Sequence, residues 1–321
     1  GTVMENSDMG HINMENLGNK TIAVTGATGF LGRYFVRGLH ASGANVVAVV
    51  RNPDKVPELK RHGIELRIAD LADRTALSRA FAGCDAVIAN AGQVSLSPDY
   101  DELIMQNLDG TRNTLHACAD AHVQRVVTIS SASVYQKIRS DIAIDETAPL
   151  RTANDKRHRF SIYPISKALA EQESWQLARE LQLTMTAIRP YAIFGAFDQH
   201  SFSYWFEWLM RWPALAPYPV GLNLPLVYAG DLARAVCATL TIDKTIGEAL
   251  NVGGNNVDFW EFYNIWASSG GFHPALRLPV PVPFKRLFDD SKIRNMTGWQ
   301  PRSFADSCHE TLATIQQQGH F

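Results

Sequence analysis

The chain has 321 residues, of which 46% are hydrophobic and 19% are charged. This length and composition suit one large globular domain, or two coupled ones, with a sizeable core. The formal net charge of −2 excludes a bulk electrostatic attraction to nucleic acid or to an anionic membrane. No run reaches the roughly eighteen consecutive apolar residues that a membrane span needs, so no span is predicted.

The four cysteines predict neither a metal site nor a disulfide framework. None belongs to a CxxC motif or to a Cys/His cluster. They stand far apart in the chain, at Cys84, Cys118, Cys237 and Cys308. A reduced, cytoplasmic location fits this usage best. Residues 1–19 are polar and lack the apolar stretch of a signal peptide, so we expect a disordered tail.

Taken in chain order, the first half alternates β-branched runs with helical patterns. Strands are predicted at residues 21–25, 45–50, 64–69, 85–89, 125–130 and 184–189. Helices are predicted at residues 30–42, 74–81, 110–121 and 163–181. This alternation predicts an α/β fold of the Rossmann type, a doubly wound parallel sheet with helices on both faces. We expect residues 20–190 to form this domain.

After Pro190 the alternation weakens and prolines become frequent. We interpret two proline clusters as loops, at Pro213, Pro217, Pro219 and Pro225 and at Pro279, Pro281 and Pro283. Residues 191–321 are therefore expected to form a smaller C-terminal lobe on the substrate side, with some segments returning to the first domain.

A glycine-rich turn separates the first predicted strand from the first helix. Gly26, Gly29 and Gly32 are spaced by three residues each. Such glycines allow a tight turn and a close approach of the backbone to a pyrophosphate, which the helix N-terminus attracts. A glycine triplet alone is weak evidence, but its place between a strand and a helix strengthens it. The loop predicts a dinucleotide cofactor; the alternative is an ordinary glycine-rich turn.

The residues after the second and third strands bear on the choice of cofactor. An acidic residue after the second strand would bind the ribose 2′-hydroxyl of NAD, but this chain has Arg51 there. An arginine suits a 2′-phosphate, so NADP is favoured over NAD; a solvated surface arginine is the alternative. Asp70 is placed to accept a hydrogen bond from the adenine amino group, or else to cap the next helix.

Tyr163 and Lys167 are four residues apart and share one face of a predicted helix. A free tyrosine has a pKa of about 10, and a nearby cation favours its phenolate. A phenol tuned in this way exchanges a proton with a carbonyl or an alcohol. The YxxxK spacing is common by chance. Support comes from Ser131, which follows the fifth strand at the sheet edge where ligands bind; the alternative is a serine that caps a turn.

Taken together, these motifs resemble the extended short-chain dehydrogenases/reductases, an NAD-dependent epimerase/dehydratase-like family. The resemblance covers about residues 20–315 and follows the family's order of motifs. It rests on TGATGFLG, Asp70-Leu71, Asn107 with Gly110-Thr111, SSASVY, YPISK, Arg189-Pro190 with Phe194-Gly195, YAGDLA at 228–233, NVGG at 251–254, and Asp290-Ser291-Lys292 with GWQP at 298–301.

The resemblance implies roles for individual residues. Ser131 is implied as the catalytic serine, Tyr163 as the acid/base, and Lys167 as the residue that binds the nicotinamide ribose. Asn107 resembles the family asparagine near the active site, or it only supports the structure. The expected cofactor contacts are Gly26, Thr28, Gly29, Phe30, Leu31, Gly32, Arg51, Asp70, Leu71, Ala89, Ala91, Lys167 and Pro190. A homodimer formed by two helices that flank the sheet is also implied.

The chain departs from relatives that act on nucleotide sugars. Ala192 stands where they carry an asparagine that contacts a phosphate, and Leu224 lies in a stretch that lacks their arginine. A diphosphate without a basic partner would bind poorly. The pattern is closer to hydroxysteroid-dehydrogenase-like and dihydroflavonol-reductase-like members. The predicted function is therefore interconversion of a carbonyl and an alcohol on a small, apolar substrate. A nucleotide-sugar epimerase or dehydratase, and a non-catalytic cofactor sensor, are the alternatives.

Two further segments suggest substrate contacts. Aromatic side chains crowd residues 202–212 and predict either an apolar pocket or a buried helix. Basic side chains crowd residues 151–159, where we expect a surface loop over the active site. They are either solvated or receive an anionic group of the substrate; this set is Arg151, Lys156, Arg157, His158 and Arg159.

Overall fold

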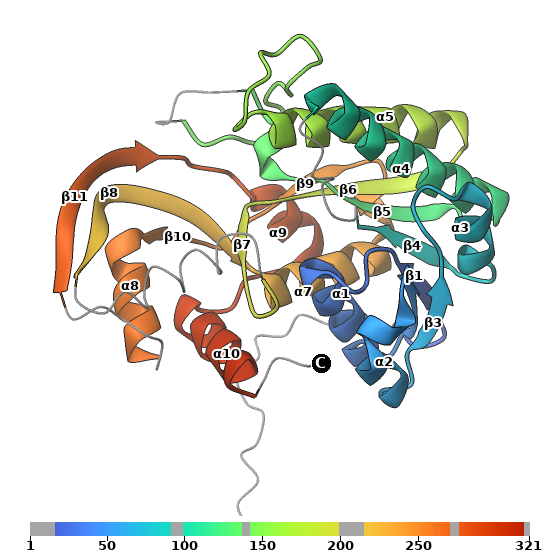
Figure 1. Ribbon diagram of the computed structural model, residues 1–321, viewed down its shortest axis with the longest axis horizontal. Coiled ribbons are helices and arrows are strands. Elements are labelled where there is room, and N and C mark those ends of the chain that lie inside the picture. The colour runs from blue at the N-terminus through green and yellow to red at the C-terminus, as the bar shows by residue number, and fades with distance from the viewer. Residues whose placement is uncertain (1–16, 91–98, 137–141, 199–214, 270–275, 318–321) are drawn as a thin grey trace, which may run out of the picture.

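The computed structural model describes residues 17–90, 99–136, 142–198, 215–269 and 276–317. Within these ranges seven parallel strands form one sheet in the order β3-β2-β1-β4-β5-β6-β9 (Figure 1). The strands are β1 (Thr21–Val24), β2 (Asn45–Val50), β3 (Glu65–Ile68), β4 (Ala86–Ala89), β5 (Arg125–Ile129), β6 (Thr184–Pro190) and β9 (Ala249–Val252). The order reverses between β1 and β4, which is the place where open α/β sheets bind ligands.

Helices cover both faces of this sheet. One face carries α3 (Arg74–Phe81), α4 (Tyr100–Asp120) and α5 (Ile162–Glu180), packed side by side (Figure 1). The other carries α1 (Phe30–Ala41) and α7 (Ala229–Thr241), which also pack on each other. Shorter elements are α2 (Pro57–Arg61), α9 (Ser291–Thr297) and the 3₁₀ turns η1 (Pro53–Lys55), η2 (Ala132–Val134) and η3 (Asp243–Thr245).

Strand β2 shows why the sheet needs two helical layers. Val46, Ala48 and Val50 join the core on the α1 side. Val47 and Val49, which alternate with them, join the core on the α3–α5 side. Successive side chains of a strand point to opposite faces, so a strand that is apolar at every position must be covered twice. The predicted fold class, a doubly wound parallel sheet, is confirmed.

A second, smaller sheet lies beside the first. It contains β7 (Ala192–Phe194), β8 (Leu215–Tyr228), β10 (Asn255–Asp258) and β11 (Leu276–Lys285), with order β10-β8-β11 and β7 paired to β8. Helix α8 (Phe259–Ser268) packs on β8, and α10 (Phe304–Gln316) packs on α8. Figure 1 shows β8 and β11 as a long two-stranded arch at one end of the molecule.

The proline clusters that we interpreted as loops lie mostly in strands of this arch, so that interpretation was wrong. Pro279, Pro281 and Pro283 belong to β11, and Pro217 and Pro219 to β8. Alternate residues of a strand direct their N–H groups to the same side. Prolines at every second position therefore remove donors from one edge only and leave the other edge able to pair.

Most predicted elements agree with the structure within a residue or two. The main difference among them is α4, which begins at Tyr100 instead of residue 110. No helix or strand after residue 190 was predicted, so β9 and α7 are additions that the structure makes. Asp99 starts α4 early because its side chain accepts hydrogen bonds from the N–H groups of Asp101 and Glu102. The N-terminal tail was expected to extend to residue 19, but Leu17 is buried and its N–H donates to Ser42 O. Every helix in the described ranges is too short or too polar to span a bilayer.

Candidate active site

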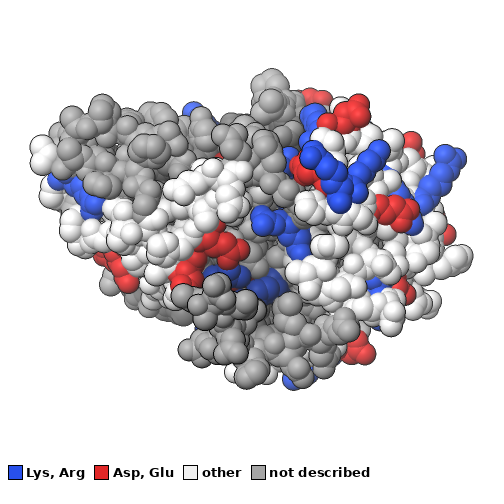
Figure 2. Space-filling view, turned by 90° about the horizontal axis from the view of Figure 1, so that it is seen from below, with Lys and Arg blue, Asp and Glu red and all other residues white. Residues whose placement is uncertain are grey.

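The candidate site lies at the carboxyl ends of β1, β4, β5 and β6. These parallel strands end at the same edge of the sheet, where the glycine loop follows β1 and Ser131 follows β5. On the face shown in Figure 2, basic and acidic side chains lie beside one another and are not segregated into single-sign regions. This face therefore carries no broad region of one charge sign.

The glycine loop between β1 and α1 is built for close backbone approach. Gly26 has a φ of +61°, a conformation that strongly favours glycine. A Cβ on Gly32 would lie 2.0 Å from Gly26 O and 2.7 Å from Ala27 Cα, so no side chain fits there. Gly29 is the N-cap of α1 and offers no side chain to the first-turn N–H groups, which remain available to an anion. These features fit the pyrophosphate of a dinucleotide.

Two polar residues that sequence analysis left out of the site fix this loop to the next strand. Thr25 Oγ1 donates to Asn90 O at 3.0 Å and accepts from Asn90 N at 3.0 Å. Both residues are buried, at the carboxyl ends of β1 and β4. Their mutual hydrogen bonds hold the two strand ends together on either side of the switch point. The position of a polar residue directly after each strand was the available signal.

The remaining nucleotide-side residues lie at the ends of β2 and β3. Arg51 is exposed after β2, and no described carboxylate pairs with it. Asp70 accepts a hydrogen bond from Ala72 N at 2.9 Å and is also exposed. It does not cap α3, because that role belongs to Asp73, whose side chain accepts from Ala76 N. Leu71 packs against Gly110 of α4.

The other predicted cofactor contacts within the described residues lie in the glycine loop or at strand ends. Thr28, Phe30 and Leu31 lie in the glycine loop and the first turn of α1. Ala89 and Pro190 are the last residues of β4 and β6, at the same sheet edge. Ala91 and the aromatic stretch at residues 202–212 lie outside the described residues.

Helix α5 carries Tyr163 in its first turn and Lys167 one turn later. Pro164 is accommodated because the first turn of a helix has no internal partner for its N–H groups. Lys167 Nζ donates to Ile129 O at the end of β5, at 2.9 Å. This bond attaches α5 to the strand that carries Ser131. Tyr163 is 44% exposed, so part of its side chain remains accessible from outside the described residues.

Ser131 lies just after β5, at the start of the η2 turn that packs against α5. It is the N-cap of η2, where its Oγ accepts from Ser133 N at 3.1 Å and lies 2.8 Å from Ser133 Oγ. Its hydroxyl also acts to lower the pKa of Tyr163, although the net shift of that pKa is upward. The capping role that was an alternative for this serine is therefore real. The neighbouring Ser130 Oγ is buried without a protein partner.

Local environment sets the protonation of the Tyr163 and Lys167 side chains. The protein around Tyr163 raises the pKa of its phenol, and the Ser131 hydroxyl only partly opposes this. Burial lowers the pKa of Lys167 to about 8, against the charge of Glu171 one turn further along α5. At neutral pH the phenol therefore holds its proton and the lysine is cationic.

Asn107 does not contact Tyr163 or Lys167 in the described hydrogen bonds. Its Nδ2 donates to Ser166 Oγ at 2.6 Å, which joins α4 to α5 beside Lys167. Ser166 is buried and immediately precedes Lys167. Asn107 thus joins α4 to α5, a contact that fits the second of its two expected roles.

A buried polar network holds α5 against the sheet. None of its members was among the predicted site residues. Glu171 accepts two hydrogen bonds from Arg189 of β6, with Nε–Oε1 of 2.7 Å and Nη2–Oε2 of 2.5 Å. Arg189 also donates to Tyr135 Oη, which in turn donates to Asn251 Oδ1 of β9. Burial alone would lower the pKa of Arg189, but Glu171 outweighs it and raises that pKa. The network connects α5 with the segment after Ser131 and with β6 and β9.

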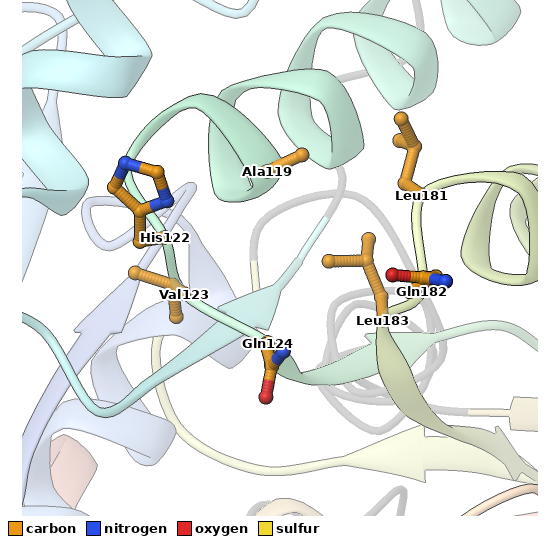
Figure 3. A pocket seen from close by; sticks show the side chains of 7 residues that line it. All are labelled: Ala119, His122, Val123, Gln124, Leu181, Gln182 and Leu183. Carbon is orange, nitrogen blue, oxygen red and sulfur yellow. The ribbon is translucent and has the colours of Figure 1, made fainter.

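A hollow at the opposite end of the sheet is not part of this site. It lies between the carboxyl ends of α4 and α5, where β5 and β6 begin (Figure 3). The side chains around it point from two loops and one helix end. They belong to Ala119, His122, Val123, Gln124, Leu181, Gln182 and Leu183. None of these was predicted to act in catalysis, and the amino ends of parallel strands are not where such sheets bind ligands.

Comparison with known proteins identifies the family. The model of the NAD dependent epimerase/dehydratase family matches residues 22–253. The chain belongs to this family. It is 32% identical to cinnamoyl-CoA reductase 2 of Medicago truncatula, over 94% of this chain and 93% of that protein. It is 30% identical to dihydroflavonol 4-reductase of Dianthus caryophyllus, over 61% of this chain and 58% of that protein.

Solved structures agree at the level of the fold. The UDP-glucose 4-epimerase of Thermus thermophilus, in complex with NAD, superposes with a TM-score of 0.73 at 24% identity, over 92% of this chain and 99% of that one. The predicted resemblance to extended short-chain dehydrogenases/reductases, including dihydroflavonol-reductase-like members, is confirmed. The chain is an NAD(P)-dependent oxidoreductase of this family.

Proposed function

We propose that this chain uses NADPH to reduce a carbonyl group on a small, apolar or aromatic molecule to an alcohol, with Tyr163 as the proton donor. The observation that carries the proposal is the packing of η2, which begins at Ser131, against α5, which holds Tyr163 in its first turn and Lys167 one turn later. The relatives named as reductases support the reaction class.

In this proposal Ser131 and Tyr163 act on the carbonyl oxygen of the substrate, and Lys167 acts on the cofactor and on Tyr163. When bound, NADPH supplies the hydride that adds to the carbonyl carbon. Ser131 Oγ and Tyr163 Oη donate hydrogen bonds to the carbonyl oxygen and orient it. Tyr163 then gives its proton to that oxygen, so that one hydride and one proton convert the carbonyl to an alcohol. Lys167 holds the nicotinamide ribose, and its positive charge stabilises the tyrosinate left behind.

The protonation of Tyr163 fits a role as the proton donor of a reduction, the direction that the relatives named as reductases support. Its phenol is protonated at neutral pH, as an ordinary tyrosine is, and burial raises its pKa further. A protonated phenol is ready to act as an acid. Oxidation of an alcohol would instead require the phenolate at the start of the reaction.

The nucleotide half of the site supports NADPH as the preferred cofactor. Gly26, Gly29 and Gly32 would hold the pyrophosphate, and Asp70 the adenine amino group. Arg51 is exposed and free of carboxylate partners among the described residues, as a ligand for a 2′-phosphate should be. The second sheet, with α8 and α10, would form the substrate-side lobe.

The decisive experiment follows NADPH oxidation by its absorbance with a panel of aromatic and aliphatic aldehydes and ketones. We expect stoichiometric conversion of NADPH and carbonyl to NADP and alcohol. An epimerase would instead interconvert a nucleotide sugar without net cofactor turnover. A panel that yields no oxidation, together with turnover of a nucleotide sugar, would reject the proposal.

We also propose that the chain forms a homodimer through α4 and α5. These helices pack side by side on one face of the sheet, and Met105 on α4 is 48% exposed. Light scattering should give twice the mass of one chain, and Met105→Glu should lower it. A monomeric mass for the unaltered protein at micromolar concentration would reject the proposal.

A further inference from the structure

Two arginines near residues 131–136 have no carboxylate partner among the described residues, unlike Arg189 and Arg302. They are Arg151, in the loop that precedes α5, and Arg286, just after β11. Both are half-buried. By contrast, Arg189 pairs with Glu171, and Arg302 pairs with Asp231. An arginine taken out of water without a counter-ion is costly, so such a pair needs an explanation.

Backbone pairing brings these two arginines together. Residues 149–151 run antiparallel to 134–136, with Arg151 N donating to Val134 O at 2.8 Å. The Tyr135 ring on that segment lies 6.1 Å from the ring of Phe288, and the Arg286 guanidinium lies over the same Phe288 ring at 5.3 Å. Burial lowers the pKa of Arg286, and the nearby charge of Arg151 lowers it further. No carboxylate contributes to that shift.

Three acidic residues near Arg151 and Arg286 in the chain form hydrogen bonds with other groups. Glu146 accepts a hydrogen bond from Asn251 N, and Asp289 accepts one from Ser291 N. Asp155 accepts from Thr152 N within its own turn. Both arginines therefore present positive charge to the same space without internal neutralisation among the described residues.

Arg151 is also oriented for a ligand. Its Nε donates to Ser133 O at 3.1 Å, and this bond fixes the plane of the guanidinium. Its two terminal nitrogens make no hydrogen bond to any described residue and are not buried. Ser133 Oγ lies 2.8 Å from Ser131 Oγ, so the guanidinium is one residue removed from Ser131. A planar guanidinium with free terminal nitrogens matches a carboxylate or phosphate group.

We propose that Arg151 and Arg286 bind an anionic group, a carboxylate or a phosphate, at the end of the substrate remote from its carbonyl. This inference rests on the proposed reductase function and narrows its substrate class. The anion does not belong to the cofactor, because the arginines lie by β5, β6 and β9, across β4 from the glycine loop and Arg51. Phe288 and Tyr191, whose ring centroids lie 4.7 Å apart in a tilted arrangement, provide an apolar surface between the two arginines and β6.

The other basic residues of the 151–159 loop serve different purposes. Arg157 forms an ion pair with Asp101 of α4. Arg159 is exposed and lies over the ring of Phe160. Of the five basic residues in the loop, the anion-binding hypothesis therefore keeps Arg151. Its partner is Arg286, more than a hundred positions later in the chain. Arg159→Gln provides a matched control, since it removes one arginine from the same loop without touching the pair.

The test compares charged aldehydes with their neutral methyl esters, with NADPH as the reductant. One pair is 4-formylbenzoate and its methyl ester, and the other is 4-formylphenyl phosphate and its dimethyl ester. We expect kcat/KM to favour the charged member of at least one pair by about tenfold or more, and that pair identifies the anion. Arg151→Gln and Arg286→Gln should abolish this preference through KM, while Arg159→Gln retains it. Equal losses on charged and neutral substrates, or no preference in the unaltered enzyme, would overturn the proposal.

A binding measurement separates this proposal from the proposed function. Calorimetry of the NADP-loaded protein with benzoate, phenyl phosphate and benzamide needs no turnover. Binding of either anion, but not of benzamide, and its loss in Arg286→Gln would support the site even if no aldehyde is reduced. Absence of anion binding would overturn it even in an active reductase. Because Arg286→Gln removes a like-charge repulsion, its Tm should not fall, which guards against misfolding as the cause.

Discussion

The nucleotide half and the substrate half of the sheet edge are built in different ways. Around β1 and α1, backbone shape makes the site: Gly26 in a left-handed conformation, Gly32 without room for a Cβ, and an uncapped helix start. Around β5, β6 and β9, side chains make it, through the Glu171–Arg189 pair and the two arginines that lack a carboxylate. A backbone-built site depends on adjacent residues, whereas a side-chain-built site depends on residues that the fold brings together.

The strongest test of the substrate half is Tyr163→Phe. It removes the proton donor but keeps the ring and its position at the start of α5. We expect kcat to fall by about 10²–10⁴-fold, the usual contribution of general acid catalysis, with NADPH affinity almost unchanged. Steady-state kinetics and fluorescence titration of NADPH measure the two quantities. Activity within a few-fold of the unaltered enzyme would remove Tyr163 from the mechanism.

The corresponding test of the nucleotide half is Gly32→Ala. The new Cβ would lie 2.0 Å from Gly26 O, a backbone atom that moves only if the loop is displaced. We expect NADPH affinity to fall by about 100-fold, because the pyrophosphate needs that loop in place. Gly110→Ala is the control: its Cβ would meet only the Leu71 side chain, at 3.6 Å. If both variants bind NADPH equally well, the loop does not hold the cofactor.

Glu171→Gln probes the buried network that fixes α5. It leaves Arg189 buried without a counter-ion, which costs about 3–5 kcal/mol when one partner of such a pair is removed. We therefore expect a large fall in Tm and in the free energy of unfolding. Glu173→Gln, on the same helix, breaks the more exposed pair with Arg112 and should cost under about 1 kcal/mol. Similar costs for both variants would contradict this ranking.

Arg51→Ala should affect the cofactor choice but not the chemistry. We expect the KM for NADPH to rise by about tenfold while that for NADH stays the same, since only NADPH carries the 2′-phosphate. Kinetics with both cofactors at a fixed carbonyl concentration measure the ratio. If the two KM values change in parallel, Arg51 acts on a part that both cofactors share.

The smallest expected effect is the pH dependence set by Lys167. Its pKa is lowered to about 8, so the cation is present below pH 8 and is lost above it. We expect kcat/KM to decline above about pH 8, and Lys167→Arg to abolish that decline in whatever activity it retains. The same shift makes the folded state gain stability between about pH 8 and 10.5, where only the unfolded chain keeps the proton. An unchanged decline in Lys167→Arg would assign it to another group.

The nucleotide half was easier to predict from the sequence than the substrate half. The first strands and α1 follow from β-branched runs and glycine spacing, because both are local patterns. Tyr163 and Lys167 were found because one helix carries both. The Glu171–Arg189–Tyr135–Asn251 network was missed because its members come from four segments far apart in the chain. Arg286 follows a proline-rich run and belongs to no motif, so only its proximity to Arg151 reveals it.

The proline spacing of β11 has a consequence for the behaviour of the protein at high concentration. Among the described strands β11 is one edge of its sheet, and its exposed residues include Leu276 and Leu278. An apolar edge strand ordinarily invites pairing with another chain and can nucleate aggregation. Here Pro279 and Pro281 remove two alternate N–H groups in the middle of the strand, and the irregular register after Pro281 disturbs the edge further. The prolines thus hinder β11 from pairing with a strand of another chain, although its exposed apolar side chains would favour that pairing.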